Sequence, residues 1–217
     1  MTIDQYHTIK ELATAEFKDK GSRFIAYSFP AHSIEEFEKG LEEIKKEHFK
    51  ARHHCYAYRI GIEGDLARAN DDGEPSGSAG LPILNQLRSK ELCNAASVVV
   101  RYFGGTKLGV SGLINAYKTS TAQSIDNAEI ILTIVGKKVQ IYFDYSQLGR
   151  LMNILKKKEL NMIEKSFEAE AYVTLEIRES VLEETMVDLK AALCSMSIEE
   201  YLNKKPKMEN YKFIELA

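Results

Sequence analysis

The chain has 217 residues, of which 44% are hydrophobic and 28% are charged, and its formal net charge is −3 at pH 7. This length allows one large domain or two modest ones, and the apolar content lets each half build a core. Neither half has an excess of Lys and Arg over Asp and Glu. A domain that binds phosphate backbones indiscriminately is therefore excluded, and any attraction to nucleic acid must be local.

Cysteine usage and hydropathy indicate the compartment. Cys55, Cys93 and Cys194 form no short pairing, which suits a reducing environment. No basic segment followed by an apolar run begins the sequence, and no stretch approaches eighteen apolar residues. We expect a cytoplasmic protein with no signal peptide and no membrane contact.

The first third of the sequence predicts a hairpin, a helix and a strand. Residues 9–29 form the hairpin, with its turn at 18–21. Ser33 and Glu36 fit a capping box that opens a helix ending near His48. The strand follows at residues 55–62.

The next stretch predicts a loop and the clearest strand. Residues 71–80 are rich in Gly, Ser and acids, and Pro82 opens a short helix after them. Residues 95–103 read as a strand buried on both faces, because three consecutive valines lie within it. A helix whose partly apolar face packs on the sheet comes next, and includes Leu113 and Tyr117.

A second domain is expected to begin near residue 128. Its βαββαβ order is that of a ferredoxin-like sandwich, so the chain reads as an α+β protein with domains 1–127 and 128–217. Ser180 and Glu183 fit a second capping box, and the charged tail from residue 203 is expected to lie on the surface or fray. The predicted elements are strand 130–143, helix 147–157, strands 161–167 and 169–177, helix 181–193 and strand 197–202.

The turn at residues 101–109 is the most informative motif. Gly104 and Gly105 can adopt positive φ and leave the backbone open to a ligand. With Arg101, Lys107 and the N-terminus of the following helix, they favour an anion. RNA fits better than a small nucleotide, because the Walker and dinucleotide spacings are absent. The alternative is a tight connection whose glycines serve geometry alone.

A second motif, at residues 51–59, contains two adjacent histidines. In a strand, Arg52 and His54 share one face while His53 and Cys55 share the other. The two histidines then cannot ligate one metal, and the zinc-site spacings are absent, so we predict no metal site. Positive charge beside tyrosines suits RNA. The alternative is that one histidine is a half-buried hydrogen-bonding residue.

The third motif is the acidic loop at residues 71–80. Asp71, Asp72 and Glu74 place three carboxylates within four residues, which can hold a hard cation such as magnesium or anchor nearby arginines. A solvated acidic turn is the alternative. No nucleophile or base partner is identifiable, so we predict no catalytic residue.

These motifs, taken in order, resemble a known family. Together they are similar to the IMPACT family, whose bacterial members are called YigZ proteins. The motifs span roughly residues 15–125, and the likeness extends more loosely to the C-terminus. The matching segments are residues 22–25, 52–55, 71–80, 98–109, 112–113 and 116–117.

The resemblance implies a fold. The N-terminal part is expected to resemble the second domain of a small-subunit ribosomal protein and domain four of elongation factor G. The C-terminal part is expected to resemble domain five of that factor. The corresponding domains of the factor meet the ribosome, which favours RNA or ribosome contact, although fold analogy is a weak warrant for function.

The resemblance also bears on activity. Eukaryotic relatives act in translation control by binding a ribosome-associated activator through an additional domain, a role that we do not carry over. Some bacterial relatives have been labelled dipeptidases, but no metal-ligand set here supports peptide hydrolysis. The sequence favours a binding protein over an enzyme without deciding between them.

We therefore predict a cytoplasmic protein that binds RNA or the ribosome and regulates translation, with no cofactor. One alternative is an enzyme that uses the acidic loop and the Gly-Gly turn on a phosphorylated or carboxylated substrate. Another is an interaction module that docks a partner protein through the sheet of its ferredoxin-like half. The expected anion-binding residues are Arg23, Arg52, His53, His54, Arg101, Gly104, Gly105 and Lys107. Of these, Arg23, Arg52, Arg101 and Lys107 are expected to converge on phosphate, and Asp71, Asp72, Glu74 and Ser76 form the acidic-loop set.

Overall fold

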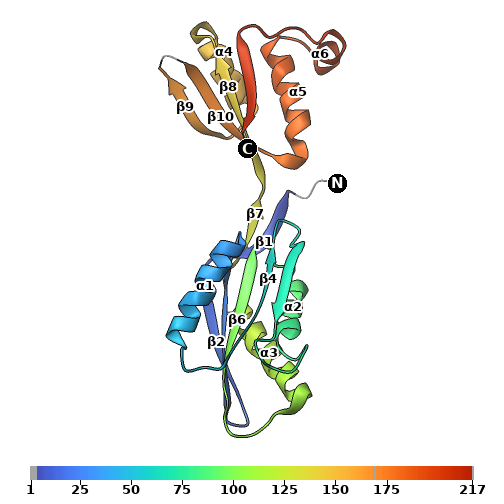
Figure 1. Cartoon of the computed structure of the whole chain (residues 1–217). Coiled ribbons are helices and arrows are strands. Elements are labelled where there is room, and N and C mark those ends of the chain that lie inside the picture. Colours follow the sequence, from blue (N-terminus) through green and yellow to red (C-terminus); the bar gives the residue numbers. More distant parts are fainter. Residues whose placement is uncertain (1–3, 169, 217) are drawn as a thin grey trace. The chain divides into compact units, whose positions relative to one another are not determined.

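The computed structural model describes residues 4–168 and 170–216, and its contacts divide the chain into two units (Figure 1). The N-terminal unit is Gln5–Thr133, and the C-terminal unit comprises Asp4 and residues 134–216. The sequence placed the boundary between residues 127 and 128. The contacts place it later, because strand β7 (Ile130–Ile134) pairs with β1 (Gln5–Ile9). None of the helices in the described ranges has the length and apolar character needed to cross a lipid bilayer.

A five-stranded sheet with the order β2-β3-β6-β4-β5 forms the centre of the N-terminal unit. Every neighbouring pair in it is antiparallel. Helix α1 packs on one face of the sheet, and helices α2 and α3 pack on the other (Figure 1). The elements are β2 (Ala13–Asp19), β3 (Ser22–Pro30), α1 (Ile34–Glu47), β4 (His53–Ile60), β5 (Leu66–Asn70), α2 (Gly80–Ser89), β6 (Ala95–Tyr102) and α3 (Gly109–Asp126).

Alternating side chains give this sheet two separate cores. On β6, Val99 packs toward α2 and α3, whereas Val98 and Val100 pack toward α1. This confirms a strand buried on both faces. On β4, Cys55 belongs to the α2 and α3 side and Tyr56 to the α1 side, as the two-residue period of a strand predicts.

Helix α1 begins where the sequence predicted it. The Ser33 hydroxyl accepts a hydrogen bond from the Glu36 amide at 3.2 Å. The Glu36 carboxylate accepts from the His32 amide at 2.8 Å, one residue earlier than in a capping box. Phe37 and Ile44 then bury the apolar stripe of the helix against the sheet.

The C-terminal unit follows the predicted βαββαβ order, with one additional helix, α6, before the last strand. Its four strands form an antiparallel sheet in the order β11-β8-β10-β9, and α4 and α5 contribute Leu151 and Leu189 to a core with Ile141 and Val173. The elements are β8 (Gly136–Phe143), η1 (Tyr145–Gln147), α4 (Leu148–Lys157), β9 (Met162–Phe167), β10 (Ala171–Arg178), η2 (Glu179–Val181), α5 (Leu182–Leu193), α6 (Ile198–Lys204) and β11 (Tyr211–Leu216).

The last strand lies later than predicted. The strand expected at residues 197–202 is helix α6, because Ser197 and Glu200 form a complete capping box that starts a helix. The fourth strand is β11, within the tail that was expected to lie on the surface or fray. The strand expected at residues 169–177 corresponds to β10, and its first residue lies outside the described residues.

Two smaller predictions are also corrected. Ser180 does not cap α5, whose N-cap is Val181 without a side-chain bond, and the Ser180 hydroxyl instead donates to Asp4. The single strand expected at residues 130–143 is two strands, β7 and β8. They join different sheets and are separated at Val135.

Candidate functional site

The register of the central strands places one cation at the heart of the predicted site. Phe24 on β3 and His53 on β4 both lie directly opposite Arg101 on β6. Opposed residues in antiparallel strands point to the same face. Phe24 belongs to the core beneath α2 and α3, so Arg101 and His53 point to that face as well.

Arg101 is held in a buried ion pair with the acidic loop. Its Nη1 lies 2.6 Å from Glu74 Oε1, and the two side chains are only 8% and 4% exposed. The Tyr117 hydroxyl donates to the same oxygen at 2.8 Å. The guanidinium lies 5.5 Å from the Phe24 ring centroid and 5.6 Å from that of Phe103. Of the two roles expected for Glu74, the geometry supports anchoring an arginine, and this anchoring occupies Arg101.

A buried thiol extends this network. Cys55 Sγ lies 3.3 Å from the Tyr117 hydroxyl and donates to the Asp71 carbonyl at 2.9 Å. Burial raises the pKa of the Cys55 thiol and of the Tyr117 phenol above their ordinary values. Both groups therefore stay protonated at neutral pH, and Cys55 lacks the thiolate character of a nucleophile.

Asp71 organises the acidic loop. Its Oδ1 accepts from the amides of Ala79 and Gly80, and its Oδ2 accepts from Gly77, each at 2.9 Å. These bonds satisfy amides at the start of α2, whose N-cap Ala79 has no side chain able to do so. Burial opposes ionisation of Asp71, but the three amides outweigh it and lower its pKa.

Asp72 ties the loop to β4. Its Oδ2 accepts from the His54 amide at 2.6 Å, and its carbonyl accepts from His53 Nδ1 at 2.8 Å. The Asp72 amide donates to Asn70 Oδ1 at 2.8 Å, which holds Asp72 at a φ of 41°. Ser76 lies exposed on the same loop. Within residues 4–168 and 170–216, no group of three His, Cys, Asp or Glu side chains is arranged to hold a metal ion.

The other predicted cations lie elsewhere. Arg23 is opposite Tyr102, one residue from the Phe24–Arg101 pair, so it points to the opposite face from Arg101. It forms an ion pair with Glu16 at 2.6 Å. The four cations expected to converge on phosphate therefore do not gather in one pocket.

His54 is buried on the α1 side of the sheet. It is 7% exposed, and its Nε2 has no hydrogen-bond partner among the described residues. Its Nδ1 lies 3.9 Å from Asp72 Oδ2. Burial lowers the pKa of His54, and the nearby Asp72 carboxylate opposes that change only partly. His54 is therefore a neutral residue of the interior, separate from the His53 side chain on the other face.

The two glycines of the predicted turn have different roles. A Cβ on Gly104 would lie 1.8 Å from the carbonyl carbon of Gly21, so only glycine fits where the turn meets the β2–β3 hairpin. The Gly104 amide donates to Ser22 Oγ at 3.2 Å. Gly105 has a φ of 90° and is exposed, and a Cβ added to it would meet no other atom within 4 Å. Gly104 is thus a packing residue, and Gly105 faces solvent.

Most of the predicted anion-binding residues that remain exposed lie in residues 103–108, the segment between β6 and α3, called here the exposed turn; Leu108 at its end is buried. The Phe103 side chain is 59% exposed, and Lys107 is exposed beside it in sequence. Helix α3 begins at Gly109 with no side-chain cap and no acidic residue in its first turn. Its first amides are therefore left for solvent or a ligand, at the positive end of the helix dipole. Arg52, just before β4, is also exposed.

Comparison with known proteins identifies the family. The sequence model described as the Impact N-terminal domain matches residues 20–125. The IMPACT family member YvyE of Bacillus subtilis (strain 168) is 36% identical over 175 residues, covering 79% of this chain and 81% of that protein. The chain belongs to the IMPACT family. The IMPACT family member YigZ of Escherichia coli (strain K12) is 40% identical over 108 residues, covering 49% of this chain and 53% of that protein.

A solved structure agrees in fold over the whole chain. The crystal structure of a hypothetical protein matches with a TM-score of 0.66 and 23% sequence identity, covering 100% of this chain and 99% of that one. At that identity the likeness shows the fold alone. The family predicted from the ordered motifs is thus confirmed, and the fold is mixed α and β with antiparallel sheets.

Sequence reasoning missed the role of Tyr117. It was predicted only as a core residue of α3, and it is fully buried. A buried tyrosine hydroxyl needs a hydrogen-bond partner, and this need was the available signal. Its partner, Glu74, comes from a loop whose path the sequence does not reveal.

Proposed function

We propose that this protein binds single-stranded RNA through its exposed turn and acts in the regulation of translation. The observation that carries the proposal is the Phe103 ring, which is 59% exposed and lies 5.6 Å from the Arg101 guanidinium. A large ring turned to solvent but braced from behind is suited to stack on a nucleobase. The ion pair with Glu74 holds the Arg101 guanidinium in place behind the Phe103 ring, so we expect this support to stay in position when a base binds.

The neighbouring groups supply contacts for phosphate. Lys107 carries a mobile positive charge, and Gly105 leaves its backbone open. The uncapped N-terminus of α3 directs amides and the positive end of its dipole to the same segment. Aromatic stacking combined with a few cationic contacts is the usual basis of sequence-tolerant single-strand binding.

The family resemblance supports the link to translation. Part of the proposal is that the two units resemble the ribosome-contacting domains of elongation factor G, so that the RNA is ribosomal or lies on the ribosome. Arg23 and Arg101 are committed to carboxylates, so few free cations remain at the site. We therefore expect micromolar-range affinity that is lost as salt rises.

Fluorescence anisotropy with a labelled single-stranded RNA tests the proposal. We expect Phe103→Ala to weaken binding about tenfold, because one base–aromatic stack contributes about 1–3 kcal/mol. We expect Lys107→Ala to lower the salt slope by about one, because one phosphate contact is lost.

Matched controls keep the test specific. Tyr145→Ala removes a ring that is 63% exposed in the other unit, and Lys118→Ala removes an exposed cation farther along α3. Both controls are expected to bind RNA like the wild type. Equal affinity of wild type, Phe103→Ala and Lys107→Ala at low salt would contradict the assignment to the exposed turn.

A further inference from the structure

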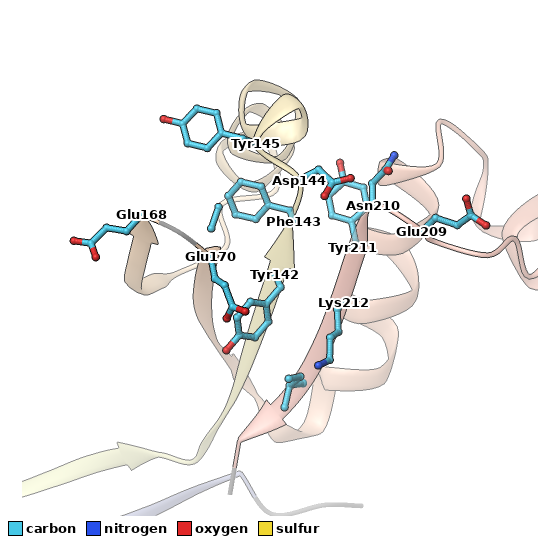
Figure 2. A pocket seen from close by; sticks show the side chains of 12 residues that line it. Tyr142, Phe143, Asp144, Tyr145, Glu168, Glu170, Glu209, Asn210, Tyr211 and Lys212 are labelled. Carbon is cyan, nitrogen blue, oxygen red and sulfur yellow. The ribbon is translucent and has the colours of Figure 1, made fainter.

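A cleft of about 520 Å³ opens in the C-terminal unit, where the end of β8 and the beginnings of β10 and β11 meet (Figure 2). Its size is that of a binding pocket for a small ligand or a few side chains. Strand β8 contributes Tyr142, followed by Asp144 and Tyr145, and β11 contributes Tyr211 and Lys212. The cleft has no part in the RNA site proposed above.

The ring of Tyr142, which lines the cleft and is called here its aromatic floor, already accepts a cation. Tyr142 is opposite both Tyr172 on β10 and Lys212 on β11, so the three side chains form a row on one face of the sheet. The Tyr142 and Tyr172 ring centroids are 5.6 Å apart. Lys212 Nζ lies 5.9 Å from the Tyr142 ring centroid, within the range of a cation–π contact. The chain thus places one of its own ammonium groups over this ring.

The rim of the cleft is acidic. Its charged residues carry a formal net charge of −3 and are Asp144, Glu168, Glu170, Glu209 and Lys212. In Figure 2, Glu168 and Glu209 extend to opposite sides of the cleft, with Asp144 and Tyr142 between them. Glu209 Oε1 lies 3.6 Å from Lys207 Nζ, and because both side chains are exposed this ion pair contributes little to stability. Such a rim repels nucleic acid and attracts basic groups.

The edge of the sheet indicates what kind of molecule carries those basic groups. Strand β11 lines the cleft and, in the described part of the chain, pairs with β8 alone. An edge strand offers backbone N–H and C=O groups that an extended polypeptide can pair with, whereas a polyamine has no backbone to offer. The free edge of β11 faces away from β8, so a chain paired there runs beside the cleft, and long basic side chains extend from it across Lys212 toward Tyr142.

We propose that this cleft binds an extended segment of a partner protein that carries arginine or lysine. The guanidinium or ammonium group would lie over the Tyr142 ring, in competition with Lys212. The carboxylates of Glu168 and Glu170 would pair with the neighbouring positive charges. The proposal does not depend on RNA binding by the other unit.

Fluorescence anisotropy of a labelled hexa-arginine peptide with the full chain at low salt tests the proposal. The double variant Glu168→Gln/Glu170→Gln is expected to weaken binding about tenfold, because two carboxylate partners are lost. Tyr142→Leu keeps apolar volume on the sheet but loses the ring, and is expected to weaken binding about threefold. Lys212→Ala is expected to tighten binding about threefold, because it removes the internal competitor.

Controls and competitors separate this site from general electrostatics. Glu183→Gln/Glu184→Gln removes two exposed carboxylates from α5 and changes the net charge equally, so it is expected to bind the peptide like the wild type. Equal weakening by both double variants, or weaker binding by Lys212→Ala, would overturn the site. Binding of spermidine as tight as that of the peptide would overturn the polypeptide as occupant. RNA binding by the cleft variants is expected to be unchanged.

Discussion

The acidic loop of the N-terminal unit and the acidic rim of the cleft contain the same kinds of residue in opposite situations. In the loop, the Asp71 carboxylate accepts hydrogen bonds from three backbone amides, and Glu74 forms an ion pair with Arg101. On the rim, Glu168 and Glu170 are exposed and line the cleft. The comparison teaches that a carboxylate is available to a ligand only when the fold has not supplied it with donors.

Burial sets the energetic difference between the two regions. The Glu74 side chain is only 4% exposed, so contacts with Arg101 and Tyr117 replace the water that it loses on folding. The rim carboxylates Glu168 and Glu170 are exposed and keep their contact with water, so the fold has no buried charge to compensate there. Substitutions should therefore destabilise the protein in the loop and weaken peptide binding at the rim.

The largest expected effect is the loss of the buried ion pair. Glu74→Ala leaves Arg101 as a buried charge without compensation, and we expect it to lower the free energy of unfolding by about 3–5 kcal/mol. Urea unfolding followed by circular dichroism measures this. The double variant Glu74→Leu/Arg101→Met removes both charges and is expected to recover most of the loss. If Glu74→Ala lowers the free energy of unfolding by less than about 1 kcal/mol, the buried pair contributes no more than an exposed ion pair, and the contrast between the loop and the rim is wrong.

Asp71→Asn is expected to have the next largest effect. Asparagine keeps the shape but loses the charge and one acceptor oxygen, and we expect a loss of about 2 kcal/mol in urea unfolding. In the folded protein the pKa of Asp71 lies below its ordinary value of 3.8, so its stabilisation is present above that pH and is lost as the pH falls through the folded pKa. Ser76→Ala, on the same loop, serves as the control and is expected to leave stability unchanged.

His54 gives a smaller effect in a different pH window. Its folded pKa lies below the ordinary value of 6.5, so the unfolded chain binds the proton more readily. The contribution of the neutral His54 side chain to the free energy of unfolding is therefore present above pH 6.5 and declines as the pH falls below that value. Burial is the main cause of the lowered pKa. The Asp72 carboxylate and a hydrogen bond with the His48 backbone oppose it, and the charges of Lys45 and His48 add to it. Thermal unfolding of the wild type between pH 7.5 and 5.5 is expected to show this decline, and His54→Gln to flatten it; equal slopes would refute the assignment.

The rim is expected to give the smallest effect on stability. Glu168→Gln/Glu170→Gln changes two exposed side chains, and we expect the free energy of unfolding to stay within about 0.5 kcal/mol of the wild type. Thermal and urea unfolding of the same protein used for peptide binding provide the measurement. A larger loss would mean that the rim acids support the fold, as the loop acids do.

Regular elements with a clear period were predictable from sequence. Val98–Val100 marked β6, and the Ser33 to Glu36 spacing marked the start of α1. The prediction failed for residues 197–202, which were assigned to the last strand of the βαββαβ order although the Ser197 and Glu200 pair specifies a helix. A local capping signal was stronger there than the expected order of elements.

The arrangement of the candidate site was much less predictable. The ordered motifs identified Arg101 and Glu74, and anchoring of nearby arginines was one of the two roles expected for the loop. Which carboxylate pairs with which arginine was not predictable, because the path of a loop depends on packing that sequence alone does not specify. Arg23 was grouped with Arg101, yet the register puts them on opposite faces, since a shift of one residue along a strand reverses the side chain. The cleft joins residues from three separated strands, and no local pattern signals such a cavity.

The contact between Gly21 and Gly104 has a consequence for engineering. The backbone of the loop after β6 packs directly against the backbone of the β2–β3 turn. No flexible side chain lies between them that could move aside to make room for a larger residue. A side chain at either glycine would collide with the backbone of the other and push the exposed turn, with Phe103, away from the hairpin. Thr106 and Lys107, both exposed and beyond that point of attachment, are instead the positions where new recognition chemistry can be installed while the scaffold keeps its shape.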